Sequence, residues 1–472
     1  MYHVLRSQPP FPSLEAEADI WERAFCTAIA AYMEEIVRIA RPTHGLYISC
    51  DGVVCAAKRR QQRLRRFKGP WFSAAAAAIE GSKGKESKGP SWDQNALTPG
   101  SAFMATLGSV LKAAGAALAA RTGLVVLVST TAEPGEGEHK LLAHMRLLKP
   151  ATCMIYGLDA DLILLSMLLH QETGATVSLL REAQEFEKDV LGVDEWRTLD
   201  VPGLVVAMGL STVQIPSFVA AMTLLGNDFL PRSLTRTVRD DGIPTIIAAL
   251  SSCGSLIAED GSLCIDSVRA LLNAWAATEE ADMLATVKKA MRDRGRHYPT
   301  DVERWQATPA IRCGIAALLD TSSVHLRLRA DWRSVYRSWI SAHASVADYV
   351  SGLAWVWDYY RGRPVDQGWF FEPHLPPLWS DVVAYLATAT AVKPPPLLYP
   401  DPLPEWLHLL AVLPADSVER LLPPEKARLM NEAPWYWPTR WSLFDIGRSQ
   451  MWECEPVLPI PSDAVLRKFV CT

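Results

Sequence analysis

The sequence lacks the features that mark secreted, zinc-binding and membrane-spanning proteins. Its nine cysteines are scattered, without a CxxC pair or the cysteine and histidine spacing of a zinc site. Such a set is typical of reduced thiols, so we expect an intracellular protein of the cytoplasm or the nucleus. The first residues contain no basic stretch followed by an apolar core, so no secretory signal is predicted. No uninterrupted apolar run reaches membrane-spanning length, and we expect no membrane association.

Two common catalytic motifs are missing as well. The chain has no Walker-type glycine loop, so we expect no nucleotide cofactor, and it has no Gly-x-Ser-x-Gly elbow for a serine nucleophile. The formal net charge is −5. The overall field therefore does not attract nucleic acid, and any such binding must use a local basic patch.

The residues that are present divide the chain into two regions. Hydrophobic residues make up 49% of the 472 positions, enough for a large core. Residues 1–255 alternate short apolar strands with helices, whereas residues 256–472 show helical periodicity to about residue 360 and then become rich in Trp, Tyr and Pro. We predict a domain boundary near residue 255, with the second region packed on the first.

The first region predicts an α/β fold. Short apolar runs at 46–50, 125–129, 153–156 and 177–180 read as strands, and helical segments separate them. This alternation favours a mostly parallel central sheet flanked by helices on both faces. Ligands of such sheets bind at the carboxyl ends of the strands, which is where the acidic residues of this chain occur.

Four separated segments carry carboxylates in short, turn-like contexts. They contain Asp51, then Glu136 and Glu138, then Asp159 and Asp161, and finally Asp228. Like charges this close repel unless a cation lies between them, and oxygen ligands favour Mg²⁺ or Mn²⁺. Two such ions about 4 Å apart can hydrolyse a phosphodiester. The alternative is ordinary loops with helix-capping acids, in which a residue such as Arg232 neutralises Asp228.

A basic run at 58–68 begins seven residues after Asp51. Many such runs are only the solvated face of a helix. Here Lys58, Gln62 and Arg65 share one face, and that face could offer several donors to a terminal phosphate. A phosphate pocket beside an acidic metal site indicates a nuclease that holds one end of its substrate.

Together these motifs resemble the XRN family of 5′→3′ exoribonucleases. The matches lie at 51–53, 58–67, 95–100, 134–140, 156–162, 226–231, 349–360, 369–377, 409–414 and 429–431, in the family's order. The resemblance implies a 5′-nuclease or PIN-like fold and an RNA-decay enzyme, active for example in mRNA degradation. Such an enzyme hydrolyses single-stranded RNA bearing a 5′-monophosphate to nucleoside 5′-monophosphates.

The resemblance also assigns roles to particular residues. Asp51, Glu136, Glu138, Asp159, Asp161 and Asp228 would hold the metal, which we expect to be two Mg²⁺ or Mn²⁺ ions. Lys58, Gln62, Arg65 and Arg66 would form the 5′-phosphate pocket, and Trp369 would stack on a base. The competing interpretation is that Trp369 only packs in the hydrophobic core.

The resemblance implies, before these motifs, a strand with a further metal-binding Asp and then a His that stacks on a base. The printed sequence does not contain that strand, and residues 1–4 are its candidate remnant, with His3 in the stacking position. Two hypotheses follow: an active exoribonuclease, or a catalytically impaired RNA-binding paralogue. A flap-type endonuclease is a third, which the Trp- and Pro-rich second region argues against.

Overall fold

The computed structural model describes residues 1–12, 15–81, 92–157, 159–183, 196–322, 325–340 and 345–469. The side chains of residues 2, 3, 15, 16 and 81 are not part of that description. The chain is a mixed α/β protein in which helices predominate and the sheets are small. The Ser/Lys/Gly-rich linker that the sequence suggests at 81–89 lies, from residue 82 on, outside the described residues.

All four predicted strands are present, but they form two small sheets. β1 (Gly45–Ser49) pairs in parallel with β2 (Val125–Ser129). β3 (Thr152–Tyr156) pairs in parallel with β4 (Thr176–Glu182), and β5 (Trp196–Asp200) adds an antiparallel strand that the sequence analysis missed. Within the described residues no strand joins β1 to β3. The expected single central sheet is therefore divided, because β1 and β3 each form a ladder on one edge only.

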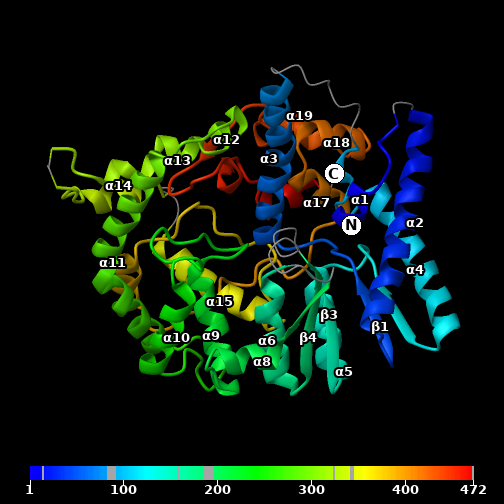
Figure 1. Cartoon of the computed structure of the whole chain (residues 1–472), viewed down its shortest axis with the longest axis horizontal. Helices are drawn as coiled ribbons and strands as arrows, with labels where there is room; N and C mark the ends of the chain where they lie inside the picture. Colours follow the sequence, from blue (N-terminus) through cyan, green and yellow to red (C-terminus); the bar gives the residue numbers. More distant parts are fainter. Residues whose placement is uncertain are drawn as a thin grey trace.

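Helices cover these sheets. α2 (Glu15–Ala40) and α4 (Ala102–Thr122) pack against each other (Figure 1), and α4 also packs against β2. A Cβ on Gly115 of α4 would lie 2.9 Å from Val128, so glycine lets this helix approach the strand closely. α5 (Gly137–Leu148) lies against β1, and α6 (Asp161–Thr173) against β4. The short α1 (Tyr2–Arg6) precedes them.

Helix α4 is long and apolar enough to cross a membrane by length and composition alone. The pair α8 (Val201–Ala207) and Thr212–Leu225, which contains α9 (Ile215–Met222), passes the same test together but is bent by 95°. Core helices also pass this test, and α4 buries Leu107, Leu111 and Leu118.

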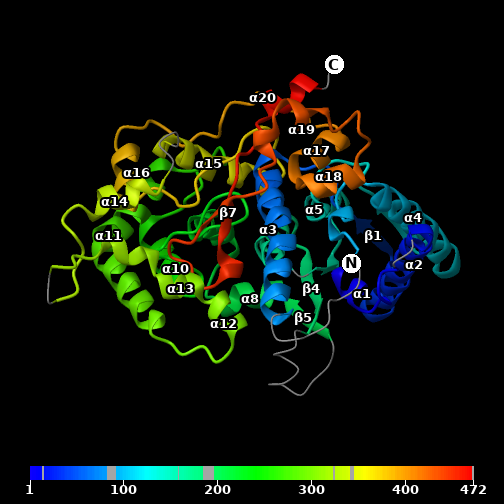
Figure 2. The ribbon, with the colours of Figure 1, turned by 90° about the horizontal axis from the view of Figure 1, so that it is seen from above.

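The basic run belongs to α3 (Ala56–Gly81), which crosses the middle of the molecule (Figures 1 and 2). This helix is longer than the predicted 58–68, because the alanines at 74–78 are strong helix formers that extend it past Pro70. Leu64 and Phe67 pack into a core with the C-terminal helices. Helix α3 thereby joins the two regions of the chain.

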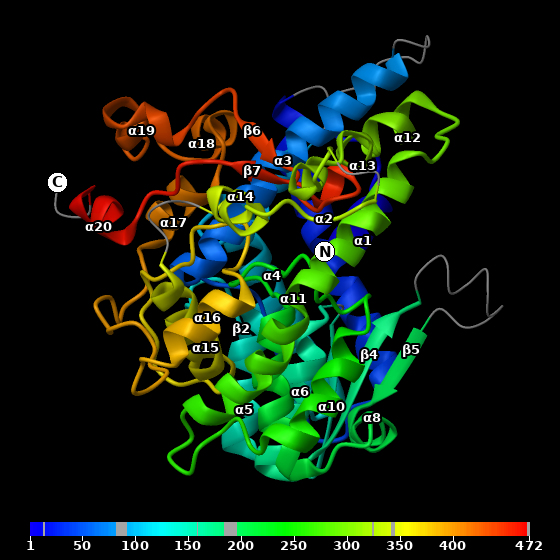
Figure 3. The ribbon, with the colours of Figure 1, turned by 90° about the vertical axis from the view of Figure 1, so that its left-hand side faces the viewer.

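The second region is mainly helical, as predicted. Helix α10 (Gly242–Cys253) ends the first region. The elements of the second region are α11 (Ile265–Arg294), α12 (Asp301–Gln306), α13 (Thr308–Arg312), α14 (Trp332–Ser338), α15 (Val346–Tyr360), α16 (Trp379–Leu386), α17 (Glu405–Val412), α18 (Ala415–Leu421), α19 (Arg428–Glu432), β6 (Ser442–Phe444), β7 (Glu455–Val457) and α20 (Asp463–Leu466). Helix α16 packs against both α11 and α15 (Figure 3). The largest core cluster combines side chains of α6, α9, α11 and α15, so the two regions share one core.

Candidate metal centre and phosphate pocket

Glycines bring Asp51 close to the loop that precedes α5. Asp51 follows β1, and its Oδ1 accepts a hydrogen bond from the Gly137 amide at 2.8 Å. The Gly52 amide donates to the Gly135 carbonyl, also at 2.8 Å. A Cβ on Gly52 would lie only 1.9 Å from the Glu133 carbonyl oxygen. Glycine after Asp51 therefore permits the close approach of the two acidic loops.

Glu136, Glu138 and His139 lie at the start of α5. Glu136 is the N-cap and is buried, whereas the other two are half-buried in the first turn. One potential ligand atom from each of the three lies within 4.8 Å of the others. Carboxylates at a helix N-terminus are favoured by the helix dipole, and this trio could hold a metal ion.

Asp159 and Asp161 lie where β3 ends and α6 begins. Asp161 is the first residue of α6 and is half-buried, and Asp159 is exposed. A Cβ on Gly157 would lie 2.2 Å from Leu162 Cδ1, so glycine lets the chain turn tightly between strand and helix. The sequence pattern correctly predicted both carboxylates at a strand end.

Asp228 reaches the same place from the turn after η3 (Thr223–Leu225). Asn227 Oδ1 accepts hydrogen bonds from the amides of Phe229 and Leu230 at 2.9 and 2.8 Å, which fixes the turn. The Asp228 carboxylate then faces α3, where Lys58 Nζ donates to Oδ2 at 2.7 Å and Gln61 Nε2 to Oδ1 at 3.1 Å. Lys58, rather than Arg232, is thus its ionic partner.

Lys58 links the acidic cluster to the basic helix. Its Nζ also lies 2.5 Å from Glu136 Oε2. Burial disfavours the charged amine, but the carboxylates of Glu136 and Asp228 outweigh it and raise the pKa of Lys58. The side chain is therefore a charged ammonium that neutralises part of the cluster from within.

The pKa shifts show that the acids interact as one group. Burial, followed by the charge of Glu136, raises the pKa of Glu138 to about 9. Burial, followed by the charge of Asp228, raises the pKa of Asp161 to about 6. Asp159 contributes to both increases. Asp51 is exposed as a residue, but the protein surrounds its carboxyl group closely, and this burial raises the pKa of Asp51 against the opposing hydrogen bond from Gly137. A divalent cation would relieve this repulsion, and the donor set is the one that Mg²⁺ and Mn²⁺ prefer.

The donors predicted for a phosphate lie along one face of α3, continuing from Lys58. Gln62 Oε1 is buried without a hydrogen-bond partner in the described structure. Arg65 is exposed. Arg66 is half-buried, and its guanidinium lies 3.4 Å from Asn95 Oδ1 and 3.4 Å from the Leu97 carbonyl. The helix thus carries three further polar side chains away from the acidic cluster.

Aromatic residues form the wall behind the acids. Tyr359 Oη donates to Glu136 Oε1 at 2.5 Å, and the Tyr359 ring stacks on Trp355 with centroids 5.0 Å apart. Trp369 lies on the far side of Trp355, also at 5.0 Å, and is partly buried against Gly352. The Trp369 side chain is thus partly buried in the core and partly accessible to solvent. The side chain of His3 lies outside the described part of the chain.

Tyr359 and Gln61 were not among the predicted site residues. Both occur in motifs that carry the family resemblance, so the motifs were the signal that could have found them. Their partners are distant in sequence: 223 residues separate Tyr359 from Glu136, and 167 separate Gln61 from Asp228. No local spacing rule connects such pairs.

Comparisons with known proteins agree with this geometry. The family description "XRN 5′-3′ exonuclease N-terminus" matches residues 7–183. The chain is 31% identical over 312 residues to the 5′-3′ exoribonuclease 2 of Debaryomyces hansenii, covering 53% of this chain and 30% of that protein. It is 29% identical over 326 residues to the same-named protein of Saccharomyces cerevisiae, covering 55% and 31%. The chain thus spans about a third of the length of the curated relatives it matches.

The fold and the site define an α/β protein with a carboxylate cluster at strand ends, next to a basic helix. Its motifs and its relatives together place it more narrowly. Residues 7–183 match the N-terminal region of the XRN 5′-3′ exonuclease family, and the chain is similar to proteins named 5′-3′ exoribonuclease 2. Nucleases of this family are generally metal-dependent, in keeping with the acidic cluster.

Proposed function

We propose that this protein is a 5′→3′ exoribonuclease that degrades 5′-monophosphorylated, single-stranded RNA to nucleoside 5′-monophosphates. The observation that carries the proposal is the meeting of carboxylates from four separated segments beside the donor-bearing face of α3. A site that combines oxygen ligands for divalent cations with donors for a terminal phosphate suits cleavage next to an RNA end.

Each residue has a role in this proposal. Asp51, Glu136, Glu138, Asp159, Asp161 and Asp228 would hold two Mg²⁺ or Mn²⁺ ions. Bound there, the ions would supply an activated water and stabilise the leaving oxygen. Tyr359 holds Glu136 in orientation through its hydroxyl, and Gln61 does the same for Asp228.

The 5′-phosphate would bind to Lys58, Gln62, Arg65 and Arg66. Lys58 has a third N–H available besides the two that face carboxylates, and the arginines can bind phosphate oxygens in bidentate fashion. The accessible part of Trp369 would stack on a base, an interaction worth about 1–3 kcal/mol that tolerates any sequence. In this proposal residues 1–255 supply the nuclease core, and residues 256–472 pack on it and complete the RNA channel.

The test uses one RNA with either a 5′-monophosphate or a 5′-hydroxyl. Both RNAs carry a label on the 5′ nucleotide. In the presence of Mg²⁺, we expect the protein to release this nucleotide first from the phosphorylated RNA and to leave the hydroxyl RNA uncleaved. Asp161→Asn should abolish release, whereas Asp293→Asn, at an exposed pair on α11, should leave it unchanged. Equal cleavage of the two RNAs, or cleavage from the interior, would contradict the proposal.

One observation favours a second candidate, an RNA-binding protein with impaired catalysis. The ammonium of Lys58 contacts two of the six carboxylates in the described structure and offsets one of their negative charges. The cluster therefore needs a metal ion less than six unpaired carboxylates would. Calorimetric titration with Mn²⁺ separates the candidates. An enzyme should bind the ion, and Asp161→Asn should weaken that binding, whereas the impaired protein should bind 5′-phosphorylated RNA without a metal site.

A further inference from the structure

A cavity of about 400 Å³ opens on the other side of the turn that carries Asp228. Asn227 lies at one wall, and the segment with η6 (Met451–Glu453) lies at the opposite wall. Its volume is within the range of small-ligand sites. No residue assigned above to the metal centre or to the 5′-phosphate pocket lines this cavity, so it needs an explanation of its own.

The cavity is rich in positive charge that the surrounding protein neutralises only in part. Arg232, Arg239 and Arg448 all line it. Burial and the charges of the other two arginines lower the pKa of Arg232. Arg239 is exposed, and it makes no ion pair with any residue that the structure describes. Three guanidinium groups that repel one another favour an anion between them.

The two acids of the cavity are held by other groups. Glu453 accepts hydrogen bonds from the Ser449 amide and hydroxyl at 2.8 and 2.9 Å, and it lies 4.0 Å from Arg232. Glu455 lies 2.6 Å from His374 Nδ1. Since other donors already satisfy these carboxylates, they do not saturate the arginines.

Two buried donors in the cavity also have no partner in the described structure. They are Nε of Arg448, whose side chain is only 7% exposed, and Nδ2 of Asn227. Both atoms are inaccessible to water, so they lie behind the cavity surface, and a ligand bonds to them only after a small movement of Arg448 or Asn227. Buried donors without acceptors cost stability, and an acceptor-rich ligand such as a phosphate favours that movement.

An aromatic ring at the rim adds a second kind of recognition. Trp452 is 51% exposed, and its backbone is held in place because Lys68 Nζ donates to the carbonyls of Trp452 and Cys454, each at 2.8 Å. An accessible indole on a backbone held in this way offers a stacking surface for a nucleic-acid base. Phosphate donors next to such a ring are the two parts of a nucleotide site.

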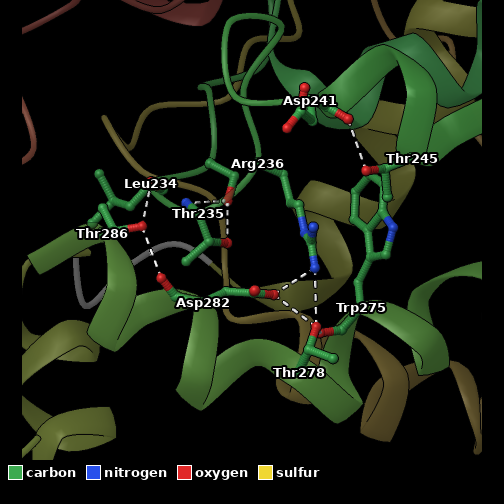
Figure 4. A network of polar contacts seen from close by, with 10 residues as sticks. Leu234, Thr235, Arg236, Asp241, Thr245, Trp275, Thr278, Asp282 and Thr286 are labelled. Carbon is green, nitrogen blue, oxygen red and sulfur yellow. Dashed lines mark hydrogen bonds and ion pairs between the residues drawn. The ribbon is translucent and has the colours of Figure 1, made fainter. Parts of the chain in front are cut away.

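The opposite wall is also held in place. Arg232, Val238 and Arg239 belong to the loop before α10, and Figure 4 shows how this loop is attached to α11. Arg236 donates to Asp282 at 2.5 Å and to Thr278 at 3.0 Å. Two of the three arginines of the cavity, Arg232 and Arg239, are thus carried by a loop that is held in place without a ligand.

We propose that this cavity is a second nucleotide-binding site, in which the three arginines and Asn227 hold a phosphate group and Trp452 stacks on the base. The ligand is one nucleotide, either within an RNA strand or free as a nucleoside monophosphate. The choice of RNA as a source rests on the proposed function. The binding itself does not, because it requires neither metal nor cleavage.

The test is calorimetric titration of the full chain in EDTA with adenosine 5′-monophosphate and with a ten-nucleotide 5′-hydroxyl oligoadenylate. Trp452→Ala should weaken binding about tenfold or more. Arg239→Gln should reduce the slope of log affinity against log salt by about 0.7, as expected for one lost phosphate contact. Both residues are exposed, so the fold should tolerate these changes. Matched controls are Trp435→Ala and Arg38→Gln, at exposed positions away from the cavity.

Each outcome discriminates. Binding of both ligands that the two cavity variants weaken supports a site for free nucleotides, and such binding of the oligonucleotide alone supports a site for an RNA strand. Binding that only the control variants weaken, equal binding by all variants, or no binding of either ligand would overturn the inference. A protein that binds in this way but does not cleave RNA would contradict the proposed function while leaving this site intact.

Discussion

Gly52→Ala tests whether the spacing of two loops sets the acidic centre. A Cβ at this position would lie 1.9 Å from the Glu133 carbonyl oxygen and 2.8 Å from the Glu133 carbonyl carbon. Real Cβ atoms stay more than 3 Å from a backbone oxygen, so one loop must move by about 1 Å. That movement separates Asp51 from the amide of Gly137, to which it is bonded at 2.8 Å.

A misplacement of about 1 Å at a reacting centre can cost about 100-fold in rate. We therefore expect Gly52→Ala to lower kcat/KM on 5′-phosphorylated RNA by about 100-fold and to weaken Mn²⁺ binding. Overpacking of this kind also costs about 1–3 kcal/mol of folding free energy. Single-turnover kinetics, Mn²⁺ calorimetry and urea unfolding measure the three effects.

Gly69→Ala is the matched control. Gly69 lies within α3, and no heavy atom would lie within 4 Å of an added Cβ. Gly69 precedes Pro70, whose ring disfavours a Cβ on the preceding helical residue, so we expect no gain in stability from alanine there, but activity and Mn²⁺ affinity should stay unchanged. If Gly52→Ala kept wild-type activity and Mn²⁺ affinity, the two loops would not set the acidic centre.

Three further changes test other contacts. Lys58→Met removes the ammonium between two carboxylates. The free energy of unfolding of the metal-free protein should fall by about 3–5 kcal/mol. Urea unfolding in the presence of Mn²⁺ should show that the ion restores part of this stability. Asp282→Ala should lower the free energy of unfolding, measured with urea, by about 1–3 kcal/mol. Asp293→Ala, at a more exposed ion pair, should lower it by less than about 0.5 kcal/mol. Despite burial, the hydrogen bond with His374 lowers the pKa of Glu455 to about 2. The ionised Glu455 carboxylate stabilises the fold fully above its usual pKa of 4.5, and this stabilisation is lost as the pH falls toward 2. The difference in unfolding free energy between wild type and Glu455→Gln should therefore become smaller as the pH falls from 4.5 to 2. A difference that grew as the pH fell would contradict this reasoning.

The acidic centre was predictable because its residues keep their local signatures. Asp159 and Asp161 follow an apolar strand, Glu136 and Glu138 open a helix, and Asp51 precedes a glycine. Such patterns depend on a few neighbours, so they can be recognised without the fold. The basic helix was recognisable for the same reason.

Contacts between distant segments were not predictable. The bond from Tyr359 to Glu136 joins residues 223 positions apart. The position of Lys58 between Glu136 and Asp228 depends on where helix α3 meets two separate loops. The division of the sheet depends on hydrogen-bonding between strands, which strand propensity does not determine.

The boundary near residue 255 illustrates a different limit. The change in composition there is real, yet one hydrophobic cluster runs from Leu165 through Leu271 to Trp355. Composition reports which elements a segment forms, and packing decides whether those elements share a core. The division into two domains remains a prediction.

The most direct test of the acidic centre is to locate Mn²⁺ in crystals of this protein by its anomalous scattering. The structural reasoning predicts density between the carboxylates of Asp51, Glu136, Glu138, Asp161 and Asp228, with Lys58 displaced from at least one of its two partners. The absence of a peak among these residues at saturating Mn²⁺, with Lys58 still bonded to Glu136 and Asp228, would contradict it.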